Sequence, residues 1–158
     1  MLVGQGVAMV GLFLCSYLFF SHLVIETVSV SGTSMLPTLR EADVYLVNRL
    51  TALFRAPHHG DIIVLKDPTD MTCAVKRVIG VEGDTVELRN GSVFLNGMRL
   101  VEPYLSRGMR TFPFNSLTQV IHCGPGQFFV LGDNRPSSSD SRCYGAVSRQ
   151  AIIGFVVR

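Results

Sequence analysis

The sequence carries little net charge and no concentrated run of basic residues. Its 14 Lys and Arg residues against 12 Asp and Glu residues give a formal charge of +2. Proteins that bind nucleic acids need a basic patch or stripe to neutralise the phosphates. We therefore expect no nucleic acid partner. A length of 158 residues leaves room for one domain with an attached segment.

Cysteine pairs of the Cys-x-x-Cys type are also absent, although the chain has Cys15, Cys73, Cys123 and Cys143. Zinc sites usually draw on such pairs, so we expect no metal ion. Two states remain open for the last three cysteines. One is a disulfide with a thiol left over, which an environment outside the cytoplasm permits, and the other is three unpaired thiols packed as small apolar groups.

Charged side chains are missing from Leu2 to Ile25, a run of 24 residues. About 20 such residues cross a bilayer as a helix, whereas a helix buried in a globular core seldom lacks a charged face over this length. The basic start and small-residue exit of a cleaved signal peptide are not evident. The sequence therefore predicts a retained transmembrane anchor over 1–25 and a domain over 26–158. The first basic residue, Arg40, lies well beyond the anchor, which is compatible with export of this domain.

Residues 26–158 contain no 3.6-residue apolar period over three turns. Short runs of β-branched and aromatic residues, such as DVYLVNRL and GDIIVLKD, alternate there with turn signals. The Asn90-Gly91 pair in ELRNGSVFLNG predicts a hairpin, and residues 103–127 predict a long connection. We predict a mostly β domain built from antiparallel sheets.

Histidine offers no clear base for a serine nucleophile. His22, His58, His59 and His122 have no partner that the local sequence indicates. A neutral lysine is a recognised alternative base, but an apolar setting must lower its pKa by about 3 units. Such a lysine has to be buried.

Lys76 meets this requirement better than any other lysine. Both faces of its predicted strand, CAVKRVIGV, are apolar apart from Lys76 and Arg77, so periodicity alone does not decide which cation is buried. Arginine does not release its proton in a protein, which leaves Lys76 as the usable base. Ser34, in a turn-like segment before Pro37, is the best nucleophile candidate.

Three segments, SGTSMLPTL, VKRVIGVEGD and GDNRPSSSDSR, follow one another behind the predicted anchor. In this order they closely resemble type I signal peptidases of the bacterial type, membrane serine–lysine proteases that release exported proteins from their signal peptides. The segments GDIIVLKDP and VFLNGMRLVEPYL extend the resemblance over nearly the whole chain. The combination is highly specific, although each motif alone is only suggestive.

The resemblance implies roles for five residues. Ser34 would be the nucleophile, Lys76 the general base and Ser138 a residue that orients the lysine. Asp140 and Arg142 would form a supporting ion pair. The resemblance also implies a β-rich protease without a cofactor, anchored once in the plasma membrane, with its catalytic domain on the extracytoplasmic side.

The substrates would be the signal peptides of preproteins, cut after a small-x-small motif. The Ser34 backbone N–H would be one oxyanion donor, but Gly32 stands where some members carry a serine that supplies the second. An extended substrate would dock as an added strand. Our candidates for its shallow apolar pockets are Val28, Val30, Met35, Leu39 and Val75.

Three rival interpretations remain open. The mitochondrial inner-membrane peptidase is a related serine–lysine protease and would suit SDSRCYG, although VFLNGMRLVEPYL is more like the bacterial enzymes. The self-cleaving repressors share the dyad but need a DNA-binding domain where this chain has its predicted anchor. The chain could also be an inactive, membrane-tethered peptide-binding module, which the retention of Ser34 and Lys76 disfavours.

Overall fold

The computed structural model describes residues 6, 9–17, 25–29 and 31–157. Residues 6 and 9–17 are helical and exposed. Within the described residues, no helix combines the length and the apolar character needed to cross a membrane. Residues 1–5, 7–8 and 18–24 of the predicted anchor lie outside the described part of the chain, and Ile25, its predicted last residue, begins a strand instead.

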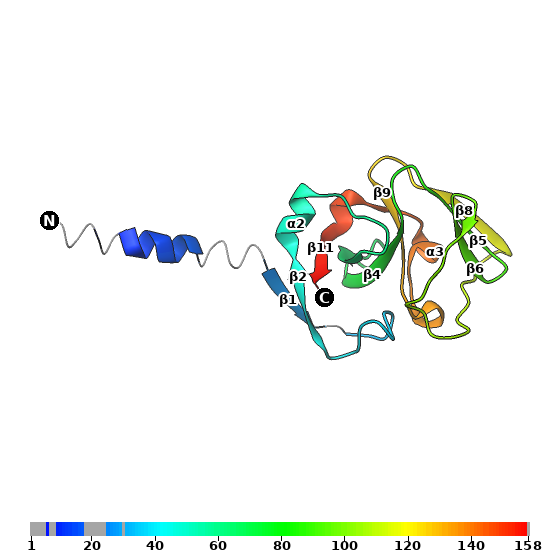
Figure 1. Cartoon of the computed structure of the whole chain (residues 1–158), viewed down its shortest axis with the longest axis horizontal. Coiled ribbons are helices and arrows are strands. Elements are labelled where there is room, and N and C mark those ends of the chain that lie inside the picture. The colour runs from blue at the N-terminus through cyan, green and yellow to red at the C-terminus, as the bar shows by residue number, and fades with distance from the viewer. Residues whose placement is uncertain (1–5, 7–8, 18–24, 30, 158) are drawn as a thin grey trace.

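The larger of two antiparallel sheets has seven strands in the order β1-β2-β11-β3-β4-β9-β10 (Figure 1). Their bounds are β1 Ile25–Ser29, β2 Val44–Asn48, β11 Ile152–Val157, β3 Ile62–Lys66, β4 Cys73–Gly80, β9 Gln127–Leu131 and β10 Val147–Ser148. A short helix, α2 (Arg49–Phe54), follows β2, and the Asn48 side chain caps it by accepting a hydrogen bond from the Thr51 N–H at 2.9 Å. The predicted mostly β, antiparallel architecture is confirmed.

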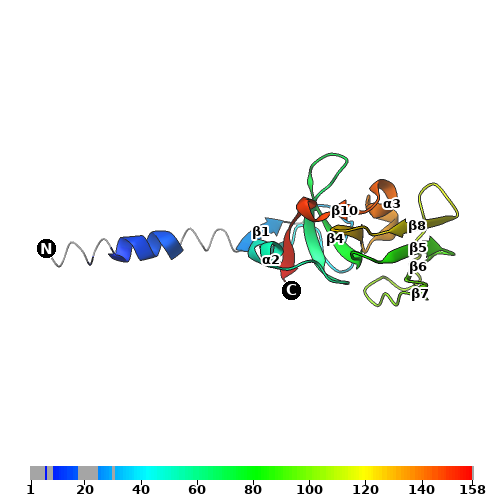
Figure 2. The ribbon, with the colours of Figure 1, turned by 90° about the horizontal axis from the view of Figure 1, so that it is seen from above.

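The smaller sheet has four strands in the order β7-β6-β5-β8 and lies at the end of the domain opposite β1 (Figure 1, Figure 2). Its strands are β7 Met98–Arg99, β6 Ser92–Leu95, β5 Thr85–Arg89 and β8 Thr118–His122. The predicted hairpin joins β5 to β6, with Asn90 and Gly91 at φ angles of 52° and 76°. These left-handed conformations favour Asn-Gly in two-residue turns. The connection predicted over residues 103–127 is shorter than expected, because β8 lies within it.

Hydrophobic residues cover both faces of the central strands. Ile63 and Val78 belong to one buried cluster, with Val130 and Phe155, and Ile79 belongs to a second that lies toward the smaller sheet. Because successive side chains of a strand point to opposite faces, Lys76 shares the Val78 face of β4 and Arg77 shares the Ile79 face. Ile63 is the residue of β3 that pairs with Lys76. Both cations of the predicted strand therefore enter the interior.

Three short helical segments complete the described part of the domain. A 3-10 turn covers Arg135–Ser137, α3 covers Ser141–Tyr144, and a second 3-10 turn covers Arg149–Ala151. Asp140 caps α3 by accepting a hydrogen bond from the Arg142 N–H. The first turn and α3 come after β9, whose last residue, Leu131, pairs with Arg77, so the chain leaves β9 beside the N-terminal half of β4.

Candidate active site

The turn between β1 and β2 carries Ser34. Met35 and Leu39, which are 1% and 0% exposed, pack on Ile62 of β3 and fasten this turn to the sheet. Backbone hydrogen bonds close the turn, from the Leu36 N–H to the Thr33 carbonyl at 3.1 Å and from the Leu39 N–H to the Met35 carbonyl at 2.9 Å. The turn thus has a fixed conformation, and Ser34 itself stays half-buried.

Lys76 of β4 reaches this serine. Its side-chain amine donates a hydrogen bond to Ser34 Oγ at 3.2 Å, and the residue is only 4% exposed. Burial among apolar neighbours lowers the pKa of Lys76, although the charges of Asp140 and Asp67 partly oppose this and the charge of Arg142 adds to it. A neutral amine beside a hydroxyl is the arrangement that a serine–lysine pair needs.

Arg77 occupies the opposite face of β4, where it is 7% exposed. Its Nε and Nη2 donate to the two carboxylate oxygens of Asp133 at 2.8 and 2.7 Å, and its Nη1 donates to the Gly60 carbonyl at 3.0 Å. Lys76 makes no ion pair with a carboxylate in the part of the chain that is described. Of the two buried cations, Arg77 has its counter-charge, and Lys76 is the one whose pKa burial lowers.

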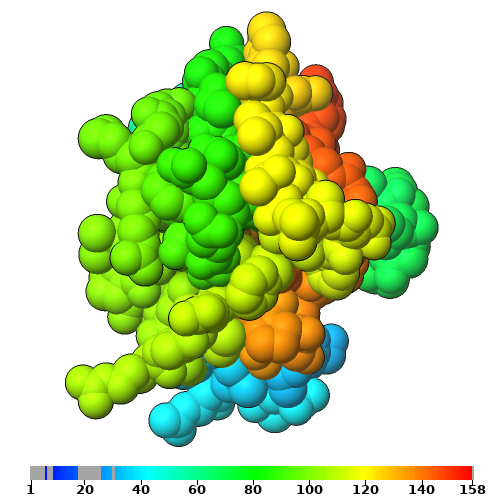
Figure 3. All heavy atoms as spheres, turned by 90° about the vertical axis from the view of Figure 1, so that its right-hand side faces the viewer, coloured from blue at the N-terminus to red at the C-terminus, as the bar shows by residue number. Residues whose placement is uncertain are grey.

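A third segment, residues 132–142, holds the Ser34 turn from the other side. The Asn134 N–H donates to the Ser34 carbonyl at 2.9 Å, and the Asn134 side-chain amide donates to the Thr33 carbonyl at 3.1 Å. Figure 3 shows this segment, in orange, against the blue and cyan segment around residues 31–42. Neither Asp133 nor Asn134 was assigned a role from the sequence, although both stand in the quoted motif GDNRPSSSDSR.

Gly132 permits the closest approach within this segment. A β-carbon at Gly132 would lie 2.2 Å from Ser138 Oγ and 2.6 Å from the Ser34 carbonyl oxygen. Ser138 is 6% exposed, and its buried Oγ has no hydrogen-bond partner among the described residues. The glycine therefore brings the Ser138 hydroxyl next to the backbone of Ser34.

Asp140 and Arg142 form a buried pair. Arg142 Nε and Nη2 donate to the two carboxylate oxygens at 2.8 and 2.9 Å, and the two side chains are 0% and 4% exposed. The same carboxylate accepts a hydrogen bond from the Gly132 N–H at 3.1 Å, and Arg142 Nη2 also donates to the Ser138 and Arg135 carbonyls. The pair thus ties together the two ends of the segment that contacts Ser34.

A cleft of about 220 Å³ opens at Ser34 and Lys76. Two of the predicted pocket residues, Val28 and Val75, line it, together with Ser29, Ser31, Val64, Cys73 and Ala74. Met35 and Leu39 do not line it, because they are buried beneath the turn. Val30 lies outside the described residues. No sequence pattern pointed to Ser29 or Ser31, whereas Cys73 and Ala74 could have been inferred because they precede Lys76 on the same strand.

The remaining candidate groups do not join this site. His58 contacts Arg55 and His59 contacts Asp84, His122 contacts Thr85, and His22 lies outside the described residues. All four cysteines are free thiols, so Cys73, Cys123 and Cys143 form no disulfide with one another; only Cys123 is buried as a small apolar group, whereas Cys73 and Cys143 are exposed. No cluster of three metal-ligating side chains occurs within the described ranges.

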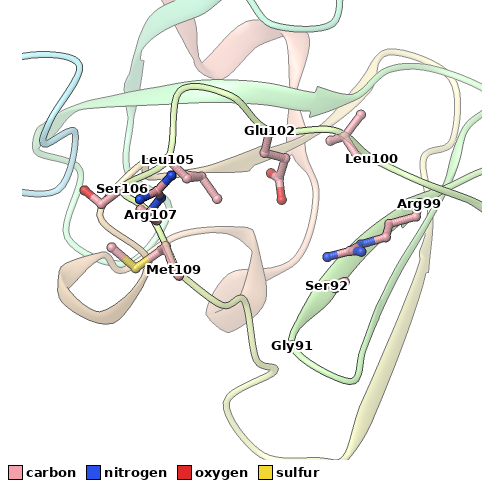
Figure 4. Close-up of a pocket in the computed structure, with 10 residues that line it drawn as sticks. Gly91, Ser92, Arg99, Leu100, Glu102, Leu105, Ser106, Arg107 and Met109 are labelled. Atoms are coloured by element: carbon pink, nitrogen blue, oxygen red, sulfur yellow. The ribbon is translucent and has the colours of Figure 1, made fainter.

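A second cavity of about 230 Å³ lies beside the smaller sheet (Figure 4). Arg99, Glu102 and Arg107 are among its lining residues, and neither Ser34 nor Lys76 lines it. Its lining includes two serines but no lysine or histidine, and its one carboxylate, Glu102, is paired with Arg135. The cleft at Ser34 is therefore the candidate active site.

Known proteins resemble this chain in sequence and in fold. The family model for signal peptidase, peptidase S26, matches residues 3–158. Signal peptidase I of Bacillus amyloliquefaciens is 34% identical over 143 residues, which cover 87% of this chain and 74% of the relative. Signal peptidase I of Leptolyngbya laminosa is 35% identical over 167 residues, which cover 97% of this chain and 77% of the relative. A crystal structure of a signal peptidase I from Enterococcus faecalis V583 matches with a TM-score of 0.53 and 32% identity, over 65% of this chain and 98% of that one.

These relatives are bacterial type I signal peptidases, which decides between the bacterial and mitochondrial interpretations. They also make the chain an enzyme rather than an inactive peptide-binding module. Since the family model matches all but the first two residues, the chain belongs to the signal peptidase family, peptidase S26, and to its bacterial type.

Proposed function

We propose that the protein is a membrane-bound endopeptidase that cleaves signal peptides from preproteins with Ser34 as nucleophile and Lys76 as general base. The observation that carries this proposal is the 3.2 Å contact from the amine of a lysine that is only 4% exposed to Ser34 Oγ. Burial lowers the pKa of Lys76, which favours the neutral amine. A neutral amine accepts the hydroxyl proton across the same contact.

The reaction proceeds through an acyl-enzyme. Ser34 Oγ attacks the scissile carbonyl while Lys76 takes its proton, and the resulting ammonium then protonates the leaving amine. Water enters, loses a proton to Lys76 and hydrolyses the ester. The Ser34 N–H makes no hydrogen bond with another described residue, so it is free to donate to the oxyanion. Gly32 supplies no hydroxyl as a second donor.

Ser138, Asp140 and Arg142 support the base. The unpartnered, buried Ser138 Oγ is an acceptor available for one of the protons of the Lys76 ammonium. Asp140 and Arg142 keep the Ser138 backbone in place, because Arg142 donates to the Ser138 carbonyl while it pairs with Asp140. They act through Ser138 and do not touch the reacting atoms.

The substrate binds in the cleft as an extended strand. β9 pairs with Arg77, Val78 and Gly80 of β4, so residues Cys73–Lys76 precede the paired part of this edge. An unpaired strand edge supplies backbone groups for an added peptide strand. Val28 and Val75 give the cleft apolar walls, and its volume of about 220 Å³ fits small side chains before the cut.

The membrane anchor is the part of the proposal that rests on composition. The 24 residues without charge, Leu2–Ile25, exceed the length needed to span a bilayer. Exposed apolar side chains gather on α2 and the neighbouring strands, which lie at the end of the domain where residue 25 enters (Figure 1). They include Leu53 and Phe54, at 77% and 81% exposure. We place the catalytic domain on the extracytoplasmic side of the plasma membrane, where signal peptides leave the bilayer.

The test is cleavage of a preprotein by the detergent-solubilised full chain. The variants Ser34→Ala and Lys76→Ala should both be inactive. Matched controls are Ser106→Ala on the smaller-sheet side and Lys66→Ala, since Lys66 is the other lysine of the chain and is exposed. Wild-type cleavage by either dyad variant would refute the assignment. Extraction of washed membranes at alkaline pH tests the anchor, because a protein without one is released.

A further inference from the structure

Glu102 and Tyr104 lie in the connection between β7 and β8, and each contacts an arginine close to the dyad. The Glu102 carboxylate accepts hydrogen bonds from Arg135 Nη2 at 2.5 Å and from Arg135 Nη1 at 3.4 Å. The two side chains are 10% and 1% exposed, so Glu102 supplies the counter-charge of a buried guanidinium. Figure 4 shows the carboxylate directed into the polar cavity beside the smaller sheet.

Tyr104 covers the second arginine. The guanidinium carbon of Arg77 lies 3.9 Å from the centre of the Tyr104 ring, which is a cation–π contact. The Tyr104 hydroxyl donates to Glu102 Oε1 at 2.9 Å. Burial and the neighbouring Glu102 charge raise the pKa of Tyr104, so the hydroxyl remains a donor. One tyrosine therefore connects Arg77 and, through Glu102, Arg135.

These two arginines hold the elements that carry the dyad. Arg77 follows Lys76 in β4 and donates two hydrogen bonds to the Asp133 carboxylate. Arg135 Nε donates to the Gly132 carbonyl at 3.0 Å. Asn134, which lies between these two contacts, donates to the Ser34 carbonyl.

The two arginines thus fix β4 against the segment that holds the Ser34 turn. The distance between the nucleophile and the base depends on this arrangement. A movement of either element changes it, although neither arginine touches the reacting atoms.

We propose that Glu102 and Tyr104 are positioning residues for the reaction, and that they act as a brace which sets the separation of Ser34 and Lys76. The proposal rests on the dyad assigned above. Without the Tyr104 ring, Arg77 loses the surface that orients its guanidinium toward Asp133. Without the Glu102 charge, Arg135 no longer holds Gly132 in a fixed place. In both cases the Ser34 carbonyl shifts relative to β4.

The smaller sheet offers matched controls for both contacts. The Arg89 guanidinium carbon lies 4.1 Å from the centre of the Phe94 ring, and Arg89 Nε lies 3.3 Å from Glu87 Oε1. Phe94→Leu and Glu87→Gln therefore remove the same kinds of contact at a site without a link to Ser34. They report the cost of a lost cation–π contact or ion pair alone.

The experiment compares kcat, KM and the pH dependence of the rate for Tyr104→Leu, Tyr104→Phe and Glu102→Gln with these controls. Rates are expressed per folded molecule, with the folded fraction taken from circular dichroism. Tyr104→Leu and Glu102→Gln should lower kcat by about tenfold to a hundredfold while KM changes by less than about twofold. Tyr104→Phe should lie between them and the wild type, because it keeps the ring and loses the hydroxyl.

The midpoint of the pH–rate profile distinguishes a positioning role of Glu102 and Tyr104 from a general loosening of the packing around Lys76. The charges that act on Lys76 are those of Asp140, Asp67 and Arg142, so the brace variants should keep the wild-type midpoint. Loosening that admits water would raise the pKa of Lys76 and move the midpoint to higher pH, which would overturn the proposal. Unchanged kcat in Tyr104→Leu, or a change in KM alone, would also overturn it. Ser34→Ala is measured alongside: if it retains activity, the dyad assignment fails instead.

Discussion

Gly132 is the position where one added methyl group should harm the dyad most. In Gly132→Ala the new β-carbon would lie 2.2 Å from Ser138 Oγ, 2.6 Å from Ser138 Cβ and 2.6 Å from the Ser34 carbonyl oxygen, where ordinary contact begins at 3.4 Å. Rotation of the Ser138 hydroxyl does not relieve the contacts with Ser138 Cβ and the Ser34 backbone. The two segments must therefore separate by about 1 Å, the difference between these distances and ordinary contact.

A displacement of that size has a kinetic and a thermodynamic consequence. Misplacement of a reacting group by about 1 Å lowers the rate about a hundredfold, or about 2.7 kcal/mol of transition-state stabilisation. Overpacking of a tight site lowers the free energy of unfolding by about 1 to 3 kcal/mol. We expect Gly132→Ala to show both losses, measured as kcat on a signal-peptide substrate and as a urea midpoint.

The control for this prediction is Gly154→Ala in β11. Its added β-carbon would lie 2.5 Å from Val47 Cγ1, so the crowding is comparable, but neither Ser34 nor Ser138 is nearby. This variant should lose stability and keep the wild-type kcat per folded molecule. A wild-type kcat for Gly132→Ala, or an equal loss of kcat in Gly154→Ala, would refute the reasoning.

Three further predictions concern charge. The rate of the wild type should rise with pH through the lowered pKa of Lys76, because only the neutral amine is a base; a rate that stays flat from about pH 6 to 9 would contradict this. The free energy of unfolding of the wild type should rise with pH between the lowered pKa of folded Lys76 and the ordinary lysine pKa, because the unfolded state binds more protons in that range. Lys76→Met should abolish this rise. Urea titrations across that range measure it, and an unchanged slope would be evidence against a buried Lys76. Arg142→Gln should lower the free energy of unfolding by about 3 to 5 kcal/mol, because it leaves the Asp140 charge buried without its partner; a melting temperature equal to that of the wild type would exclude this.

The β architecture was predictable because its signals are local. The Asn90-Gly91 turn and the alternating residues around it lie within one hairpin, so the sequence identifies both strands. The choice between Lys76 and Arg77 was not predictable from periodicity, because both are buried. What distinguishes them is Asp133, a carboxylate 56 positions from Arg77. No local pattern reports such a partner.

Apolar character alone does not predict which residues line the substrate cleft. Met35 and Leu39 flank the nucleophile in the sequence and were expected to meet the substrate, yet they anchor the turn from below. Val75 lies directly before Lys76 in β4 and does reach the cleft. A hydrophobic residue in a turn can face either the sheet or the solvent, and the direction depends on how the turn crosses the sheet. That information is three-dimensional.

The position of β11 in the larger sheet determines when the candidate active site can assemble during synthesis. β11 lies between β2 and β3, so among the described strands it is the one that joins the half carrying the Ser34 turn to the half carrying Lys76. It is also the last strand that the structure describes, and pairing between segments so far apart is slow to form. During translation the two halves remain unjoined until β11 has left the ribosome. We therefore expect a nascent chain to lack the contact between Ser34 and Lys76, and so to be unable to cut a preprotein or itself, before its synthesis has passed residue 157.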